Sequence, residues 1–100
     1  MAVADERTLR ELDDVRQRLD DLDRQLLGIL ARRFEAGSEA ARLKAQLGMA
    51  MHDPAREEQV MEQAAEWARA AGLPEAEVAD LFRRLISISR TAQINSRGQP

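Results

Sequence analysis

Apolar residues recur at alternating intervals of three and four along the first half of the chain. They are Leu12, Val15, Leu19, Leu22, Leu26 and Ile29. We call these six positions the apolar seam, because the spacing is typical of one face of an α-helix that packs against other helices. Thr8 and Glu11 fit a capping box before the seam, and Gly48 follows it. The pattern therefore predicts one helix from about residue 8 to Leu47, preceded by a flexible segment, residues 1–7.

This predicted first helix is too long for a domain of 100 residues. Nearly forty helical residues extend about 58 Å, whereas a compact chain of this size has a radius of gyration of about 13 Å. The apolar seam cannot be buried within such a domain. We therefore predict that a second copy of the chain covers it, in a two-fold homodimer of intertwined helices.

Beyond Ile29 the seam positions change character. They continue as Arg33, Gly37, Ala40 and Lys44, which are a cation, two small residues and a second cation. Eleven residues make about three turns, so Arg33 and Lys44 share one helical face about 16 Å apart. This arrangement suggests a pocket for a small anion. The alternative is a solvated face on which the cations pair with neighbouring glutamates.

Two shorter helices are predicted after the loop at residues 48–52. The second begins with Asp53 as N-cap and Pro54 as its first residue, and it stops at Gly72. Its predicted inward face comprises Arg56, Val60, Met61, Ala64, Trp67, Ala68 and Ala71. The third opens at Pro74, and its apolar face comprises Val78, Leu81, Phe82, Leu85 and Ile86, followed by Ser89 and Gln93. Residues 97–100 form a predicted polar tail, so the helical domain covers residues 8–96.

Polar residues thus interrupt the predicted inward face of every helix. They are Arg33, Lys44, Arg56, Glu57, Ser89 and Gln93. Burying such groups without partners costs several kcal/mol, so their coincidence indicates a shared wet or liganded cavity. Its charge is mostly positive, which favours a small dianion. Taken singly, each has an ordinary explanation; Asp53 beside them, for example, is accounted for as a helix cap.

Composition narrows the classes of function. The chain is 44% apolar and 3% aromatic, with a net charge of −3, one histidine and no cysteine. These values favour an all-α protein and disfavour a nucleic-acid binder, a disulfide or a histidine-rich metal site. No apolar run approaches about 20 residues, so we expect no membrane segment and a cytoplasmic protein. Without a nucleophile paired to histidine or a glycine-rich phosphate loop, an enzyme of this sequence would act by positioning and electrostatics.

These residues and spacings resemble the all-helical class of chorismate mutases over about residues 9–95. The matching pattern contains Arg16, Leu22-Asp23-x-x-Leu26-Leu27, Arg33, Lys44, Asp53-x-x-Arg56-Glu57 and Ser89-x-x-x-Gln93. The resemblance implies a homodimer of three-helix chains and a cofactor-free Claisen rearrangement of chorismate, a dicarboxylate, to prephenate. It also implies a place in the shikimate pathway of aromatic amino acid biosynthesis.

The resemblance further implies a role for each matching residue. Arg33 and the opposite chain's Arg16 would bind the two carboxylates, with help from Ser89. Lys44 and Gln93 would donate to the ether oxygen as it gains charge. Glu57 and Asp53 would bind the ring hydroxyl, and Arg56 would support that corner of the pocket. Lys44, Gln93 and Arg33 are therefore the predicted catalytic residues.

The sequence leaves several alternative functions open. Within the same scaffold, the substrate could instead be 4-amino-4-deoxychorismate, or the chain could be an isochorismate-pyruvate lyase; Glu57 favours the mutase over the lyase. A helical dimerisation module explains the apolar seam but not the inward polar residues. A weak mutase that needs an activating partner enzyme is a further alternative.

Overall fold

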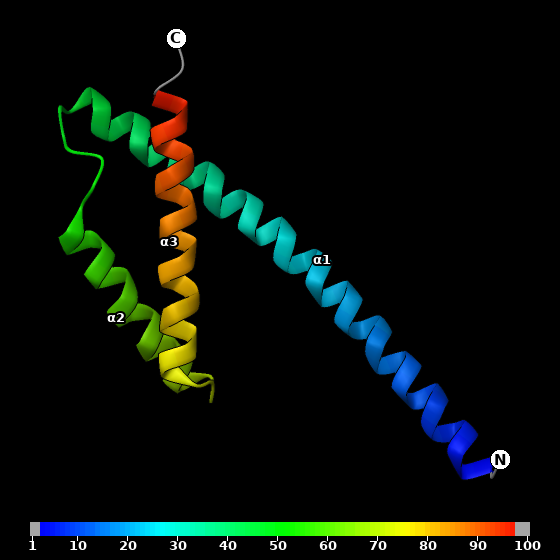
Figure 1. Ribbon diagram of the computed structural model, residues 1–100. Coiled ribbons are helices and arrows are strands. Elements are labelled where there is room, and N and C mark those ends of the chain that lie inside the picture. Colours follow the sequence, from blue (N-terminus) through cyan, green and yellow to red (C-terminus); the bar gives the residue numbers. More distant parts are fainter. Residues whose placement is uncertain (1–2, 98–100) are drawn as a thin grey trace. The chain divides into compact units, whose positions relative to one another are not determined.

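The computed structural model describes the backbone of residues 3–97 and the side chains of residues 5–93 (Figure 1). In this part of the chain it contains three helices: α1 (Val3–Gln46), α2 (Pro54–Ala70) and α3 (Glu75–Arg97). The predicted all-α fold with a very long first helix is confirmed. Residues 98–100 of the predicted tail lie outside the described residues.

Helix α1 begins earlier than the sequence pattern predicted. It already includes Val3 through Arg7, so Thr8 lies inside the helix and does not cap its start. Asp5 and Glu6 occupy the first turn, where the positive end of the helix dipole favours carboxylates. The start of the apolar seam therefore does not mark the start of α1.

The chain divides into two compact units, one ending at Glu35 and the other beginning at Ala36. The described residues of the first unit all belong to α1. Every side chain of the apolar seam is exposed there, with exposed fractions from 39% at Val15 to 57% at Leu22. No other element of this unit is available to cover the seam.

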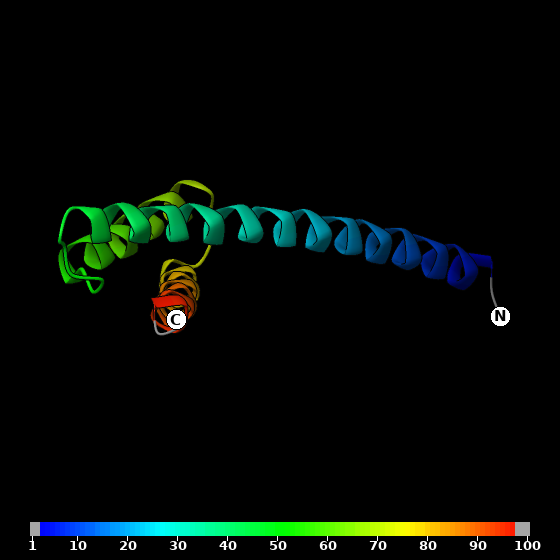
Figure 2. The same ribbon diagram turned by 90° about the horizontal axis from the view of Figure 1, so that it is seen from above.

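The second unit contains the end of α1, the helices α2 and α3, and the turns between them. Figure 1 shows α2 and α3 running antiparallel, and Figure 2, seen along α3, shows α2 beside it. Ala64 and Ala68 of α2 are buried at 1% and 2% exposure, because their small side chains allow α3 to approach closely. These two alanines are the centre of the α2 packing face.

Two large residues lie outside the faces that the sequence assigned to them. Trp67 is 60% exposed and Leu81 is 59% exposed. Each is next in sequence to a less exposed residue, Ala68 in α2 and Phe82 in α3, and adjacent residues of a helix point about 100° apart. They lie at the edges of the α2–α3 contact, so the prediction that they point inward is wrong for the single chain.

The predicted helix boundaries around both turns are confirmed. Asp53 caps α2 by accepting a hydrogen bond from the backbone nitrogen of Arg56 at 3.2 Å. Gly48 and Gly72 follow α1 and α2 with φ of 70° and 71°, a conformation that glycine adopts without strain. The next residue after each glycine donates back into the helix: Met49 to the Lys44 carbonyl at 2.9 Å, and Leu73 to the Ala68 carbonyl at 2.8 Å.

An exposed ion pair joins the end of α2 to the start of α3. The Arg69 guanidinium donates to both carboxylate oxygens of Glu75, at 2.7 and 3.2 Å. These hydrogen bonds, followed by the charge of Arg69, hold the pKa of Glu75 below its ordinary value of 4.5. A carboxylate with a lowered pKa stabilises the fold above that ordinary value and loses its contribution as the pH falls further.

We therefore expect the wild-type protein to lose more stability than Glu75→Gln when the pH is lowered from 7 to 3. The urea midpoint at each pH measures this difference, which should be small because the pair is exposed. Glu77→Gln is the matched control. It removes a carboxylate from the same turn of α3, and that carboxylate makes no ion pair within the described part of the chain. An equal pH response in wild type and Glu75→Gln would contradict the prediction.

Candidate active site

The predicted site residues are divided between the two units. Arg16 and Arg33 belong to the first unit, where Arg16 is exposed and Arg33 is half-buried. The other six belong to the second unit: Lys44, Asp53, Arg56, Glu57, Ser89 and Gln93. Within the second unit the structure brings several of them against neighbouring elements.

Ser89 and Gln93 meet α1 at Gly37. The Gln93 side-chain amide donates a hydrogen bond from Nε2 to the Gly37 carbonyl oxygen at 3.2 Å. A Cβ at position 37 would lie 3.5 Å from Gln93 Nε2 and 3.9 Å from Ser89 Oγ. Both distances are ordinary van der Waals contacts, so the two polar side chains of α3 lie directly against α1 at this glycine. A Cβ at Gly28, by contrast, would have no atom within 4 Å among the described residues.

Ser89 carries the least satisfied polar group of this region. Its Oγ is buried and has no hydrogen-bond partner among the described residues. Such a hydroxyl costs about 1–3 kcal/mol relative to one with a partner. Gln93 lies one turn later. One of its amide hydrogens is donated to the Gly37 carbonyl, and the second is available for another hydrogen bond. This part of α3 thus offers two polar groups that a ligand can use.

Lys44 lies in the last turn of α1 and is half-buried. Its ammonium makes no ion pair with any residue that the structure describes, although the negative end of the helix dipole favours a cation there. Ala41, one turn before it, is buried at 9% exposure, while Ala40 is exposed. Gly37 and Ala41 are four residues apart and share one face of the helix.

Glu57 is half-buried, with 23% of its side chain exposed. Its Oε1 forms an ion pair with Nη2 of Arg90 on α3. Its Oε2 lies 3.8 Å from Nδ1 of His52 in the loop before α2. Asp53, half-buried beside it, is engaged as the α2 cap.

The sequence did not assign a role to Arg90. A signal was present, because Arg90 lies four residues after Ile86 and three before Gln93, and residues at these spacings share one side of a helix. The inward placement predicted for Arg56 is not seen in the single chain. Arg56 is exposed, and its guanidinium donates to Gln59 Oε1 at 2.8 Å along the outside of α2. The positive charge beside Glu57 is supplied by Arg90 instead.

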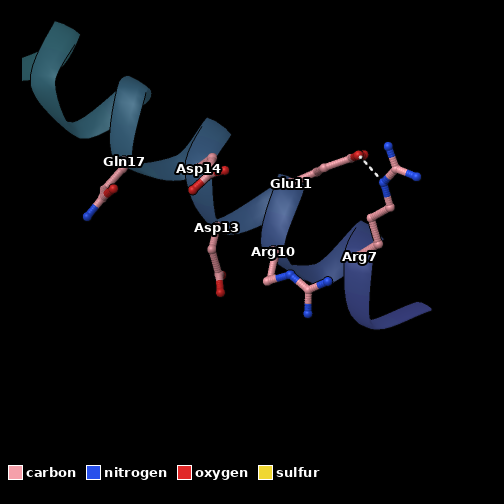
Figure 3. A pocket seen from close by; sticks show the side chains of 6 residues that line it. All are labelled: Arg7, Arg10, Glu11, Asp13, Asp14 and Gln17. Carbon is pink, nitrogen blue, oxygen red and sulfur yellow. Dashed lines mark ion pairs between the residues drawn. The ribbon is translucent and has the colours of Figure 1, made fainter. Parts of the chain in front are cut away.

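Two other hollows contain none of the predicted site residues. One, of about 650 Å³, lies along the first turns of α1 and is lined by Arg7, Arg10, Glu11, Asp13, Asp14 and Gln17 (Figure 3). Its charges are mixed, and Arg7 pairs with Glu11 at 3.5 Å. The other, of about 320 Å³, follows the surface of α3 and is lined by Arg84, Ser87, Ile88, Thr91 and Ala92. Each is lined by one helix only.

Within residues 3–97, no helix has both the length and the apolarity needed to cross a membrane. The described residues also contain no group of three histidine, cysteine, aspartate or glutamate side chains that could hold a metal ion. Among the predicted site residues of the second unit, Lys44 offers an ammonium, Ser89 a hydroxyl and Gln93 an amide. These three groups can bind a small anion by charge and hydrogen bonds.

The fold and these groups define an all-helical protein with a candidate site for a small anionic ligand. Residues 15–94 match the model of the family described as chorismate mutase type II. The chain therefore belongs to the type II chorismate mutase family, as its resemblance predicted. All eight predicted site residues lie within the matched range.

Similar proteins fall into three groups. The chain is 32% identical over 88 residues to a T-protein of Enterobacter agglomerans, which covers 88% of the chain and 23% of the T-protein. It is 25% identical to a chorismate mutase of Methanocaldococcus jannaschii, over 85% of the chain and 86% of the relative. It is 36% identical to a 4-amino-4-deoxychorismate mutase of Streptomyces venezuelae, over 77% of the chain and 75% of the relative. The chain thus spans less than a quarter of the length of the T-proteins that it matches. No solved structure gives a significant match.

Proposed function

We propose that this chain is a chorismate mutase that rearranges chorismate to prephenate without a cofactor or covalent intermediate. The match to the type II family over residues 15–94 carries the proposal. The rearrangement is intramolecular, so the protein must fold the substrate into a reactive shape and stabilise the charge that develops on the ether oxygen. The ammonium, amide and hydroxyl of the second unit are suited to that task.

The roles follow the family pattern. Arg33 and the opposite chain's Arg16 bind the two carboxylates of the substrate, and Ser89 assists. Lys44 and Gln93 donate to the ether oxygen, and Glu57 with Asp53 binds the ring hydroxyl. The buried Ser89 hydroxyl without a partner supports this proposal, because a ligand oxygen would complete its hydrogen bonding. Arg56 is exposed near the start of α2, and its positive charge makes the electrostatic potential of the proposed site more positive.

We propose that the working form is a homodimer in which the apolar seams of two α1 helices meet. The exposed fractions of 39–57% along the seam support this pairing, because burying each large apolar side chain contributes about 1.5–3 kcal/mol. A two-fold dimer would contain two sites, each receiving Arg16 from the opposite chain. The substrate would be a small dicarboxylate.

The proposed function is tested by supplying the pure protein with chorismate, 4-amino-4-deoxychorismate and isochorismate in separate reactions. We expect prephenate from chorismate, at a rate that added lysate does not change. The 36% identity to a 4-amino-4-deoxychorismate mutase makes that substrate the second candidate. Turnover of the amino substrate alone would establish this alternative, and pyruvate released from isochorismate would establish a lyase. No turnover of any of the three would contradict the proposal.

Gln93 leads to a prediction about pH. An amide donates a hydrogen bond at any ordinary pH, so wild-type turnover should be flat near neutrality. The variant Gln93→Glu must be protonated to donate, and its ionised carboxylate would face the Gly37 carbonyl that Gln93 now contacts. Its kcat should therefore fall by about tenfold per pH unit above the pKa of the new glutamate, with activity restricted to acid.

Steady-state rates between pH 5 and 8 measure this effect. Gln63→Glu introduces the same group on the exposed surface of α2 and serves as the control, for which we expect the wild-type profile. If Gln93→Glu were as active at pH 8 as at pH 5, Gln93 would not be a donor to the ether oxygen.

A further inference from the structure

Glu57 does not face the proposed substrate as a lone carboxylate. Arg90 forms an ion pair with its Oε1, and the two side chains are only 23% and 36% exposed. A guanidinium stays charged at any ordinary pH, so this corner of the second unit carries a permanent positive charge beside the negative one. His52 Nδ1 lies 3.8 Å from the other oxygen, and Asp53 is engaged in capping α2.

The two carboxylate oxygens of Glu57 are therefore not equivalent. Oε1 is bound by Arg90, while Oε2 lies beyond hydrogen-bond distance of His52. An ionised carboxylate accepts only, so Oε2 can accept a hydrogen bond from a neutral hydroxyl. The hydroxyl needs no counter-ion, and the existing ion pair does not oppose it.

An ammonium in the same place would meet different electrostatics. It would gain attraction from Glu57, but it would also meet a second full positive charge a few ångströms away on Arg90. Because both side chains are partly buried, solvent screens this repulsion less than at an open surface. The charge of Glu57 is already balanced by Arg90, so a cationic substituent gains little net attraction.

We infer that Arg90 is a specificity-determining residue. It makes the part of the site around Glu57 selective for a substrate whose ring substituent is a neutral hydroxyl over one whose substituent is an ammonium. This inference rests on the proposed function, and it narrows the substrate class to chorismate-like ring alcohols. Arg90 acts through Glu57, so it is a positioning residue. It fixes Oε1 and leaves Oε2 for the ring substituent.

The test compares kcat/KM for chorismate and for 4-amino-4-deoxychorismate in wild type and in Arg90→Met. Methionine keeps much of the apolar length of arginine and removes the charge. We expect wild type to prefer chorismate and Arg90→Met to shift the ratio toward the amino substrate by about tenfold or more. Arg90→Lys keeps the charge and should keep a ratio near the wild-type one.

Arg83→Met is the matched control. Arg83 is also on α3 and is also paired with a carboxylate, Asp80, but this pair is on the exposed side of the helix. We expect the control to leave the ratio unchanged. If Arg90 only holds α2 and α3 together, Arg90→Met should lower kcat/KM for both substrates by the same factor. The ratio of the two kcat/KM values would then stay as in wild type.

Two outcomes overturn the inference in distinguishable ways. If wild type converts chorismate but the ratio in Arg90→Met stays within about twofold of wild type, Arg90 does not set specificity and the proposed function stands. If wild type converts neither substrate, the proposed function fails and the inference fails with it.

Discussion

Lys44→Ala is expected to lower kcat by about 10²- to 10³-fold while the protein stays folded. The loss follows from the proposed role of the ammonium, which meets charge that appears on the ether oxygen only in the transition state. Removing one such donor from other enzymes costs about 3–4 kcal/mol of transition-state stabilisation. The effect should fall mainly on kcat, because the interaction is weak with the bound substrate.

The fold should tolerate this change. The Lys44 backbone carbonyl, which accepts from Leu47 and Met49 at the end of α1, is unaffected by the side chain. The lost charge at the helix C-terminus costs only about 0.3–1 kcal/mol. Arg42→Ala is the control, since Arg42 lies on the same turn, is 67% exposed and pairs with Glu39 at 3.9 Å. Wild-type turnover in Lys44→Ala would remove the central role proposed for this residue.

The second large effect concerns the chain that supplies Arg16. Arg16→Ala and Lys44→Ala should each retain at most about a hundredth of wild-type activity when assayed alone. When the two are refolded together in equal amounts, half of the dimers are mixed. In each mixed dimer one site combines the intact Lys44 of one chain with the intact Arg16 of the other. The mixture should therefore recover about a quarter of wild-type activity.

A matched mixture provides the control. Lys44→Ala and Gln93→Ala alter two residues that one chain supplies to the same site, so every site of their mixed dimer lacks one of them. That mixture should stay inactive. Recovery of activity by the control mixture, or no recovery by the first mixture, would show that Arg16 does not act across a dimer.

The fold was predictable where local chemistry determines it. The cap at Asp53, the stops at Gly48 and Gly72, and the long α1 all follow from residues whose conformational preferences act within a few positions. The prediction of which residues point inward was wrong where more residues of one helix were assigned to its packing face than that face contains. Trp67 is apolar enough for the core, but the close approach of α2 and α3 at Ala64 and Ala68 leaves no room for it there.

The site was predictable in part for a related reason. Ser89 and Gln93 extend the apolar face of α3, so their inward placement follows from helical periodicity. Helical periodicity places Arg90 on the same side of α3 as Gln93, but it does not predict that Arg90 pairs with Glu57. Arg56 is next to it in sequence, but adjacent residues on a helix point about 100° apart, and the charge that reaches Glu57 comes from Arg90 on another helix. Contacts between helices depend on how the helices pack, which periodicity within one helix does not specify.

The buried hydroxyl of Ser89 has a consequence for how this protein can evolve. A hydroxyl kept from water with no partner in the described chain makes the free protein less stable than an alanine at that position would. Selection for thermal stability alone would therefore favour losing Ser89, and selection for turnover would favour keeping it. In the proposed site, an oxygen of the bound substrate would supply the hydrogen bond that Ser89 lacks in the free chain.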